Sequence, residues 1–172
     1  QLYRHPIPTM KRVERYLMLC INARYKGLVT TITRLVHFGP PPADLVRQVR
    51  HNLQIECAMI SRTIIGRPMN EPVVAAIDLY ERLGYSGEWR LHHQGGAMGY
   101  YPRDIRVTPA TQRLVAQNQA FCWNPSISGT KTEDAFVAMP DGPKMITGPV
   151  LFPAITVESE GRQFERPGLL VL

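Results

Sequence analysis

The sequence of 172 residues lacks any apolar run close to the roughly 18 residues that a membrane-spanning helix needs. It also lacks the basic start, apolar centre and small-residue cleavage site of a secretory signal. These absences predict a protein that does not insert into a membrane and that is located in the cytoplasm.

Cysteine is scarce, and the three that occur (Cys20, Cys57 and Cys122) lie in apolar stretches without the spacing of a CxxC motif or a zinc finger. Such dispersed cysteines are typical of reduced, buried thiols. The sequence also lacks a segment in which charges of one sign are concentrated. The net charge is +6, but the arginines are scattered singly and no run of five like charges occurs. We therefore expect a solvated basic surface and no nucleic-acid partner.

Internal repeats and low-complexity segments are also missing, and the composition, 44% hydrophobic and 20% charged, is that of an ordinary globular protein. The length suits one domain with a real core. We expect a single domain over residues 1–172. Because the sequence opens at Gln1 with a loop-like stretch, we also expect this domain to be the C-terminal part of a longer chain.

Two strands are predicted first. Residues 13–25 form a mostly apolar stretch without a helical stripe, which favours a strand buried on both faces. Lys26 and Gly27 fit a tight turn, because glycine supplies the positive φ that a hairpin requires. Residues 28–38, rich in Thr, Val and Ile, return as a second strand that ends at Pro40.

Two helices are predicted next from apolar residues at helical spacing. The first runs from about Leu45 to a stop near Gly66. The second has Asn70 as its expected N-cap, Pro72 in its first turn and Gly84 as its left-handed C-terminal residue.

The second half of the sequence reads as short strands separated by Gly and Pro. Residues 88–101 indicate a strand or loop, and residues 111–118 a short connection or helical turn. Strands are predicted at 120–123, 135–138 and 144–147, with an extended tail over 148–172. The order hairpin, two helices, antiparallel strands indicates an α+β fold.

Three blocks of sequence then carry a family resemblance. Residues 23–34 are similar to the pattern Asp-x-Gly-Ala-x-Tyr-x-Gly-Tyr-x-Ser-Asp-x-Thr-Arg, and His92–Gly96 stands where that family has Gly-His-Gly-x-Gly. Residues 124–127 and 129–134 resemble Glu-Pro-Gly-x followed by Gly-x-Arg-x-Glu-Asp. The family is that of the pita-bread metallopeptidases: methionine aminopeptidase, aminopeptidase P, prolidase and the non-metal relative creatinase.

The resemblance implies a curved antiparallel sheet with helices on one side. Relatives in the aminopeptidase P branch carry an additional N-terminal domain and often dimerise, so a homodimer is expected as well. Family members hold two divalent cations with two Asp, one His and two Glu, because hard ions favour carboxylate oxygens.

We compared each of these five ligand positions with the residue at the matching position of this sequence, and few of them are conserved in type. The positions fall on Cys20, Thr31, His93, Asn124 and Glu133. Only His93 and Glu133 match, and His92 is a near alternative for the histidine. The family has four carboxylates at these positions and this sequence has one, Glu133. Cations without anionic partners are costly to bury. We therefore expect no cofactor and no dinuclear centre, although a single divalent metal on Cys20, His93 and Glu133 stays open.

The resemblance implies a creatinase-like, metal-free hydrolase acting on a C–N bond of a small peptide or amide. His93 would be the general base, since its unperturbed pKa of about 6.5 suits proton transfer, and Glu133 would orient a cationic group. Two alternatives are a non-catalytic domain that binds a peptide or amide, and an aminopeptidase with one metal ion.

Four further residues are candidates for substrate binding. His92 lies beside glycines where the backbone can approach a ligand. Arg103 could bind a substrate carboxylate, Asn124 an amide, and Tyr100 could form a pocket wall. Plainer roles are open as well: histidines bonded to loop carbonyls, a salt-bridged turn at Arg103, turn chemistry at Asn124 and a core position for Tyr100. For the predicted catalytic Glu133, the plainer role is a solvent-facing charge.

Overall fold

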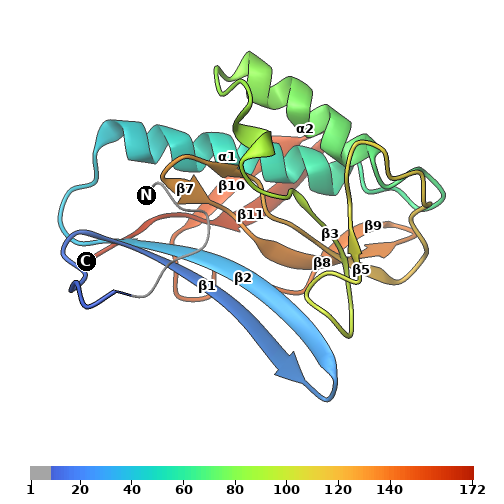
Figure 1. Cartoon of the computed structure of the whole chain (residues 1–172), viewed down its shortest axis with the longest axis horizontal. Helices are drawn as coiled ribbons and strands as arrows, with labels where there is room; N and C mark the ends of the chain where they lie inside the picture. Colours follow the sequence, from blue (N-terminus) through green and yellow to red (C-terminus); the bar gives the residue numbers. More distant parts are fainter. Residues whose placement is uncertain (1–8) are drawn as a thin grey trace.

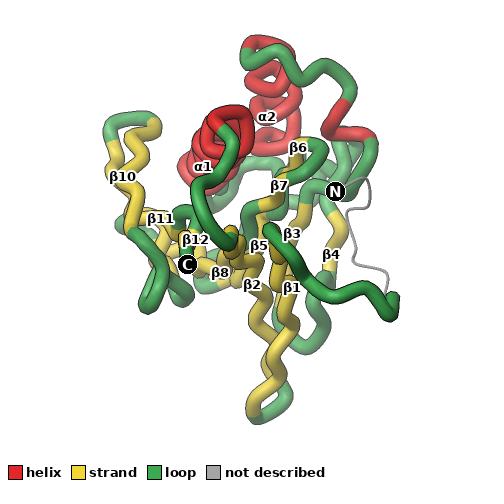
Figure 2. The backbone as a smooth tube through the Cα atoms, turned by 90° about the vertical axis from the view of Figure 1, so that its left-hand side faces the viewer, coloured by secondary structure: helices red, strands yellow, loops and turns green. Residues whose placement is uncertain are grey.

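The computed structural model describes residues 9–172 of the chain. Two helices, α1 (Ala43–Ser61) and α2 (Glu71–Arg82), lie on one side of a curved layer of strands (Figures 1 and 2). This confirms the predicted α+β fold. In the part of the chain that the structure describes, neither helix has the length and apolarity needed to cross a membrane.

The β1–β2 hairpin supplies the first sheet. β1 (Tyr16–Tyr25) and β2 (Leu28–His37) pair antiparallel along their whole length. The two residues of the turn, Lys26 and Gly27, have φ values of 48° and 89°, as the hairpin turn type I′ requires. The short strand β12 (Leu170–Val171) pairs parallel with β2 and completes the order β1-β2-β12.

The prediction of a first strand buried on both faces is wrong. β1 begins at Tyr16 rather than at residue 13, and the side chains of Leu19 and Ile21 are 37% and 46% exposed. The reason is its place at the edge of a three-stranded sheet, where the far end of the hairpin projects away from the helices (Figure 2).

The remaining elements are short. They are η1 (Glu88–Arg90, a 3-10 turn), β3 (Gly95–Met98), β4 (Ile105–Arg106), β5 (Gln119–Trp123), β6 (Ser126–Ile127), β7 (Thr130–Lys131), β8 (Asp134–Met139), β9 (Gly142–Met145), β10 (Ala154–Ser159) and β11 (Arg162–Pro167). Five of these strands form a second sheet in the order β4-β3-β5-β8-β9, and β6-β7 and β10-β11 form two-stranded ribbons. The two larger sheets join where the Thr33 N–H donates to the Glu133 carbonyl at 3.0 Å.

Helix α1 ends at Ser61, five residues before the predicted stop near Gly66. Just beyond this end, the Thr63 hydroxyl donates to the Met59 carbonyl at 2.8 Å and accepts the indole N–H of Trp123 at 2.9 Å. A buried indole N–H needs an acceptor, and Thr63 supplies it from the end of the helix.

Helix α2 starts and ends close to the predicted residues. Gly84 follows it with a φ of 83°, as expected of a left-handed C-terminal glycine. The predicted cap is wrong in its hydrogen bond, because the Asn70 side chain donates to the Pro109 carbonyl at 2.8 Å and makes no bond to the helix. Residues 111–118 form a connection without a helical turn.

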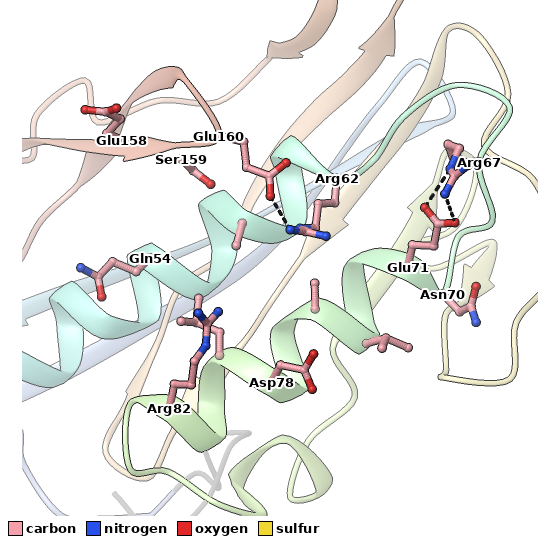
Figure 3. Close-up of a pocket in the computed structure, with 14 residues that line it drawn as sticks. Gln54, Arg62, Arg67, Asn70, Glu71, Asp78, Arg82, Glu158, Ser159 and Glu160 are labelled. Carbon is pink, nitrogen blue, oxygen red and sulfur yellow. Dashed lines mark hydrogen bonds and ion pairs between the residues drawn. The ribbon is translucent and has the colours of Figure 1, made fainter.

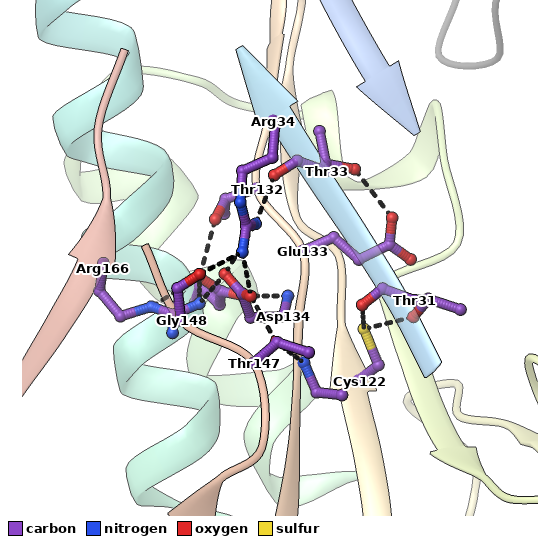
Figure 4. A network of polar contacts seen from close by, with 12 residues as sticks. Thr31, Thr33, Arg34, Cys122, Thr132, Glu133, Asp134, Thr147, Gly148 and Arg166 are labelled. Carbon is purple, nitrogen blue, oxygen red and sulfur yellow. Dashed lines mark hydrogen bonds and ion pairs between the residues drawn. The ribbon is translucent and has the colours of Figure 1, made fainter. Parts of the chain in front are cut away.

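A buried ion network holds the helices to the sheets. Arg166 on β11 contacts both Glu56 on α1, at 2.7 Å, and Asp134 on β8, at 2.9 Å. Arg34 on β2 contacts the other oxygen of Asp134 at 2.8 Å (Figure 4). Two carboxylates and two guanidinium groups balance in charge, so the network ties four elements together without an unpaired charge.

We expect Arg166→Met to lower the free energy of unfolding by about 3–5 kcal/mol, because it leaves two buried carboxylates without their shared partner. Urea unfolding measures the change. Arg162→Met, on the same strand but exposed, is the matched control. It should lower the free energy of unfolding by well under half as much. Equal losses in both variants would contradict the importance of the network.

Candidate functional site

Glu133 lies at the junction of the two sheets, and donors from three segments enclose its carboxylate. One oxygen accepts from the Thr33 hydroxyl at 2.8 Å and from the Lys131 ammonium at 2.9 Å. The other accepts from Arg103 at 2.8 Å. Glu133 is only 5% exposed, so the reading of a solvent-facing charge is wrong.

The strand alternation explains this placement. Lys131 and Glu133 are two residues apart on extended chain, so their side chains share a face, whereas Asp134 points the other way. Figure 4 shows the two carboxylates directed apart, with Asp134 toward Arg34. The predicted opposite orientation of Glu133 and Asp134 is confirmed. Lys131 was missed as a site residue, although its spacing from Glu133 was a usable signal.

Two of the family's metal-ligand positions on the hairpin face this cluster. The Cys20 sulfur lies 3.6 Å from the Thr33 hydroxyl and 3.9 Å from the Lys131 nitrogen. The Thr31 hydroxyl donates to the Cys122 sulfur at 2.9 Å and accepts from Arg103 at 3.4 Å. Burial raises the pKa of the Cys122 thiol, so this sulfur stays protonated at neutral pH.

The two histidines precede β3, and their rings stack with centroids 4.3 Å apart. Two glycines that follow allow this segment to approach its neighbours. A Cβ at Gly95 would lie 2.2 Å from the Cys122 carbonyl oxygen, and a Cβ at Gly96 would lie 2.0 Å from the carbonyl oxygen of residue 105. Only glycine fits this spacing, which places His93 within electrostatic range of Glu133.

The surroundings lower the pKa values of both predicted catalytic residues, His93 and Glu133, but for different reasons. Burial lowers the pKa of His93 to about 4, helped by the positive charges of Arg103, Arg106 and Lys131 and opposed by Glu133. His93 is therefore neutral at neutral pH and a weak base.

For Glu133, burial acts to raise the pKa. The Lys131 ammonium and the Arg103 guanidinium outweigh it and bring the pKa down to about 2. Glu133 is ionised at any ordinary pH and cannot supply a proton.

Asn124 and Tyr100 complete the predicted set. Asn124 is 2% exposed and donates its backbone N–H to the Gln94 carbonyl, next to His93. Its side-chain oxygen has no hydrogen-bond partner within residues 9–172. Tyr100 lies apart, 68% exposed, beside Gly27 at the hairpin turn, so its part in substrate binding stays a prediction.

The residues at the family's ligand positions do not fit a pair of divalent ions. Both oxygens of Glu133, the single carboxylate among those positions, already accept from cationic side chains. Within the described residues, no group of three His, Cys, Asp or Glu side chains is arranged to hold a metal ion. Lys131 and Arg103 instead supply positive charge directly beside this carboxylate.

A larger hollow of about 680 Å³ lies elsewhere, between α1, α2 and the turn from β10 to β11 (Figure 3). Several of its charges are paired, including Arg62 with Glu160 at 2.6 Å and Arg67 with Glu71 at 2.8 Å. None of the predicted site residues lines it.

We expect Glu133 to make stability depend on acid. Its folded pKa lies below the ordinary 4.5, so its contribution is complete above pH 4.5 and is lost as the pH falls toward 2. The shift corresponds to about 3 kcal/mol. Urea unfolding over this range should give a flatter pH dependence for Glu133→Gln than for wild type. Glu158→Gln, at an exposed position, should follow the wild-type curve, and a Glu133→Gln curve parallel to wild type would refute the assignment.

No protein-family model matches the sequence, and no curated protein matches it either. Solved structures do match its fold. A dipeptidase from Pyrococcus horikoshii OT3 superposes with a TM-score of 0.79 at 18% identity, covering 99% of this chain and 46% of that one. An X-Pro aminopeptidase from Thermotoga maritima MSB8 gives 0.78 at 17%, covering 98% and 45%.

The N-terminal domain of the FACT complex subunit SPT16 from Cicer arietinum gives 0.68 at 13% identity, covering 84% and 39%. The chain therefore spans less than half the length of each of these three proteins. At these identities the comparison concerns the fold alone. The chain has the pita-bread fold, with the peptidases among its structural neighbours.

Proposed function

We propose that this chain is a peptidase-like domain that binds a small peptide or amide without a metal centre and without hydrolysing it. The observation that carries the proposal is the enclosure of Glu133 by Lys131 and Arg103. In this arrangement the carboxylate is a counter-ion for two cations, whose positive charges would repel a metal ion that approached its oxygens.

The groups around the site are poor catalysts of hydrolysis. A general base works best when its pKa lies near the working pH. His93, with a pKa of about 4, is well below that range, and Glu133, at about 2, is lower still. The Cys122 thiol, whose pKa is raised, is not a nucleophile at neutral pH.

The same groups are suited to binding an amide. The side-chain oxygen of Asn124 is buried without a partner in the described chain, which costs about 1–3 kcal/mol until a donor arrives. An amide N–H would supply that donor. The carbonyl oxygen of the same amide would then be attracted by the Lys131 and Arg103 charges, which outnumber the single negative charge of Glu133.

The structural neighbours agree with a peptide ligand. Those named as dipeptidase, prolidase and X-Pro aminopeptidase act on peptides by their names. The SPT16 domain is named as part of a complex subunit rather than as a peptidase, so the fold is also found outside named peptidases. A homodimer and a cytoplasmic location stay predictions.

A metal-free hydrolase is the second candidate. His93 is neutral at pH 7 and able to accept a proton, and Lys131 and Arg103 together resemble the donors that stabilise a developing oxyanion. The low pKa of His93 counts against it. Turnover is the property that separates the two candidates.

We expect the dipeptide Ala-Pro to bind with measurable heat in calorimetry and to remain intact in proton NMR spectra after long incubation. Lys131→Met should weaken binding at least about tenfold, because it removes one of the two cations facing the carbonyl. Lys144→Met, an exposed lysine on β9, is the matched control and should bind as wild type does. Hydrolysis that disappears in His93→Ala would establish the enzyme instead.

We also expect protein purified without chelator to contain far less than one equivalent of zinc, manganese or cobalt by elemental analysis. Adding these ions should not raise the melting temperature, since a ligand stabilises only the state that binds it. Stoichiometric metal, with a stabilisation that Glu133→Gln removes, would instead support the single-metal aminopeptidase.

A further inference from the structure

A smaller pocket of about 360 Å³ lies beside His93, where the first turn of α2, η1 and the segment after β4 meet. One part of its wall is apolar and is formed by Val73, Trp89 and Val107. Its charged part is formed by Arg90 and Arg106. An apolar wall with a few polar groups is typical of a small-molecule site.

The charged side chains that line this pocket, Arg90 and Arg106, are both positive. No acidic residue is among the described residues that line it. The ion pairs within residues 9–172 all involve other side chains, so neither Arg90 nor Arg106 is neutralised by a carboxylate of the described chain. A guanidinium in this state is a preferred partner for a carboxylate, which it can bind with two parallel hydrogen bonds.

The pocket is held in shape before any ligand arrives. The buried Gln94 side chain donates to the carbonyls of Trp89 and His92, both at 2.9 Å, and so fixes the segment between η1 and β3. The Arg90 guanidinium lies over the Trp89 ring at 5.0 Å, which restricts its position. Val73 and Val107 are 1% and 2% exposed and belong to the core.

We propose that this pocket binds the carboxylate end of an apolar acid, with Arg90 and Arg106 on the carboxylate and Trp89 against the apolar group. The inference deepens the proposed function and rests on it, because His93 lines the pocket and also lies within electrostatic range of Glu133. The ligand class is then an acylated amino acid or short peptide whose amide meets the Glu133 cluster.

The electrostatics of His93 agree with this placement. Arg106 is one of the charges that lower the pKa of His93, so its field extends across the pocket to the ring. A bound carboxylate would oppose that field.

The test compares hippurate (N-benzoylglycine) with its neutral amide, hippuramide, by titration calorimetry on the full chain. Wild type should bind the acid at least about tenfold more tightly than the amide, as expected of a charge-assisted arginine contact. The double variant Arg90→Gln/Arg106→Gln should bind both equally. Arg50→Gln, an exposed arginine on α1, is the matched control and should keep the preference.

The outcomes separate the two proposals. Equal binding of acid and amide by wild type overturns this inference alone, and so does an unchanged preference in the double variant whose fold is verified by circular dichroism. Binding of neither ligand overturns both proposals. Intact binding accompanied by release of glycine, seen by NMR, keeps the pocket and overturns the non-hydrolytic role.

Discussion

The ion cluster of Lys131, Arg103 and Glu133 is the constraint on which the site depends. A carboxylate buried to this extent needs positive partners, and here side chains of the protein provide them within 2.9 Å. These partners bring the pKa of Glu133 down, while burial, helped by the positive charges of Arg103, Arg106 and Lys131, lowers the pKa of nearby His93. Both shifts move the residues away from acid–base catalysis at neutral pH.

The position of the cluster adds a structural role. Thr33 and Glu133 form the backbone bridge between the two sheets, and the same two residues are joined by their side chains at 2.8 Å. Directly behind them, Asp134 enters the buried network with Arg34 and Arg166. Neighbouring residues of one strand therefore serve the site on one face and the core on the other, which couples the site to the packing of α1 on the sheets.

Much of the fold was predictable from local rules. The type I′ turn at Lys26, the end of α2 at Gly84 and the α+β order all follow from φ requirements and apolar spacing. The exposure of β1 was not predictable, because it depends on the edge position of that strand. Nor was the hydrogen bond from Trp123 to Thr63, which joins residues 60 positions apart. Long-range partners leave no mark on a local pattern. Lys131 is different, because its spacing of two residues from Glu133 on extended chain is a local signal that places both side chains on one face.

The enclosure of Glu133 also determines how difficult it would be to build a metal centre at this site. Acids introduced at positions 20, 31 and 124 would restore the family's oxygen ligands, yet the ammonium of Lys131 and the guanidinium of Arg103 would still pair with Glu133. Removing those two cations first would leave a buried carboxylate without partners. Each single step toward a metal enzyme is therefore unfavourable, and only concerted replacement would succeed. A buried carboxylate that already has its counter-ions within the protein therefore cannot be turned into a metal ligand by one substitution at a time.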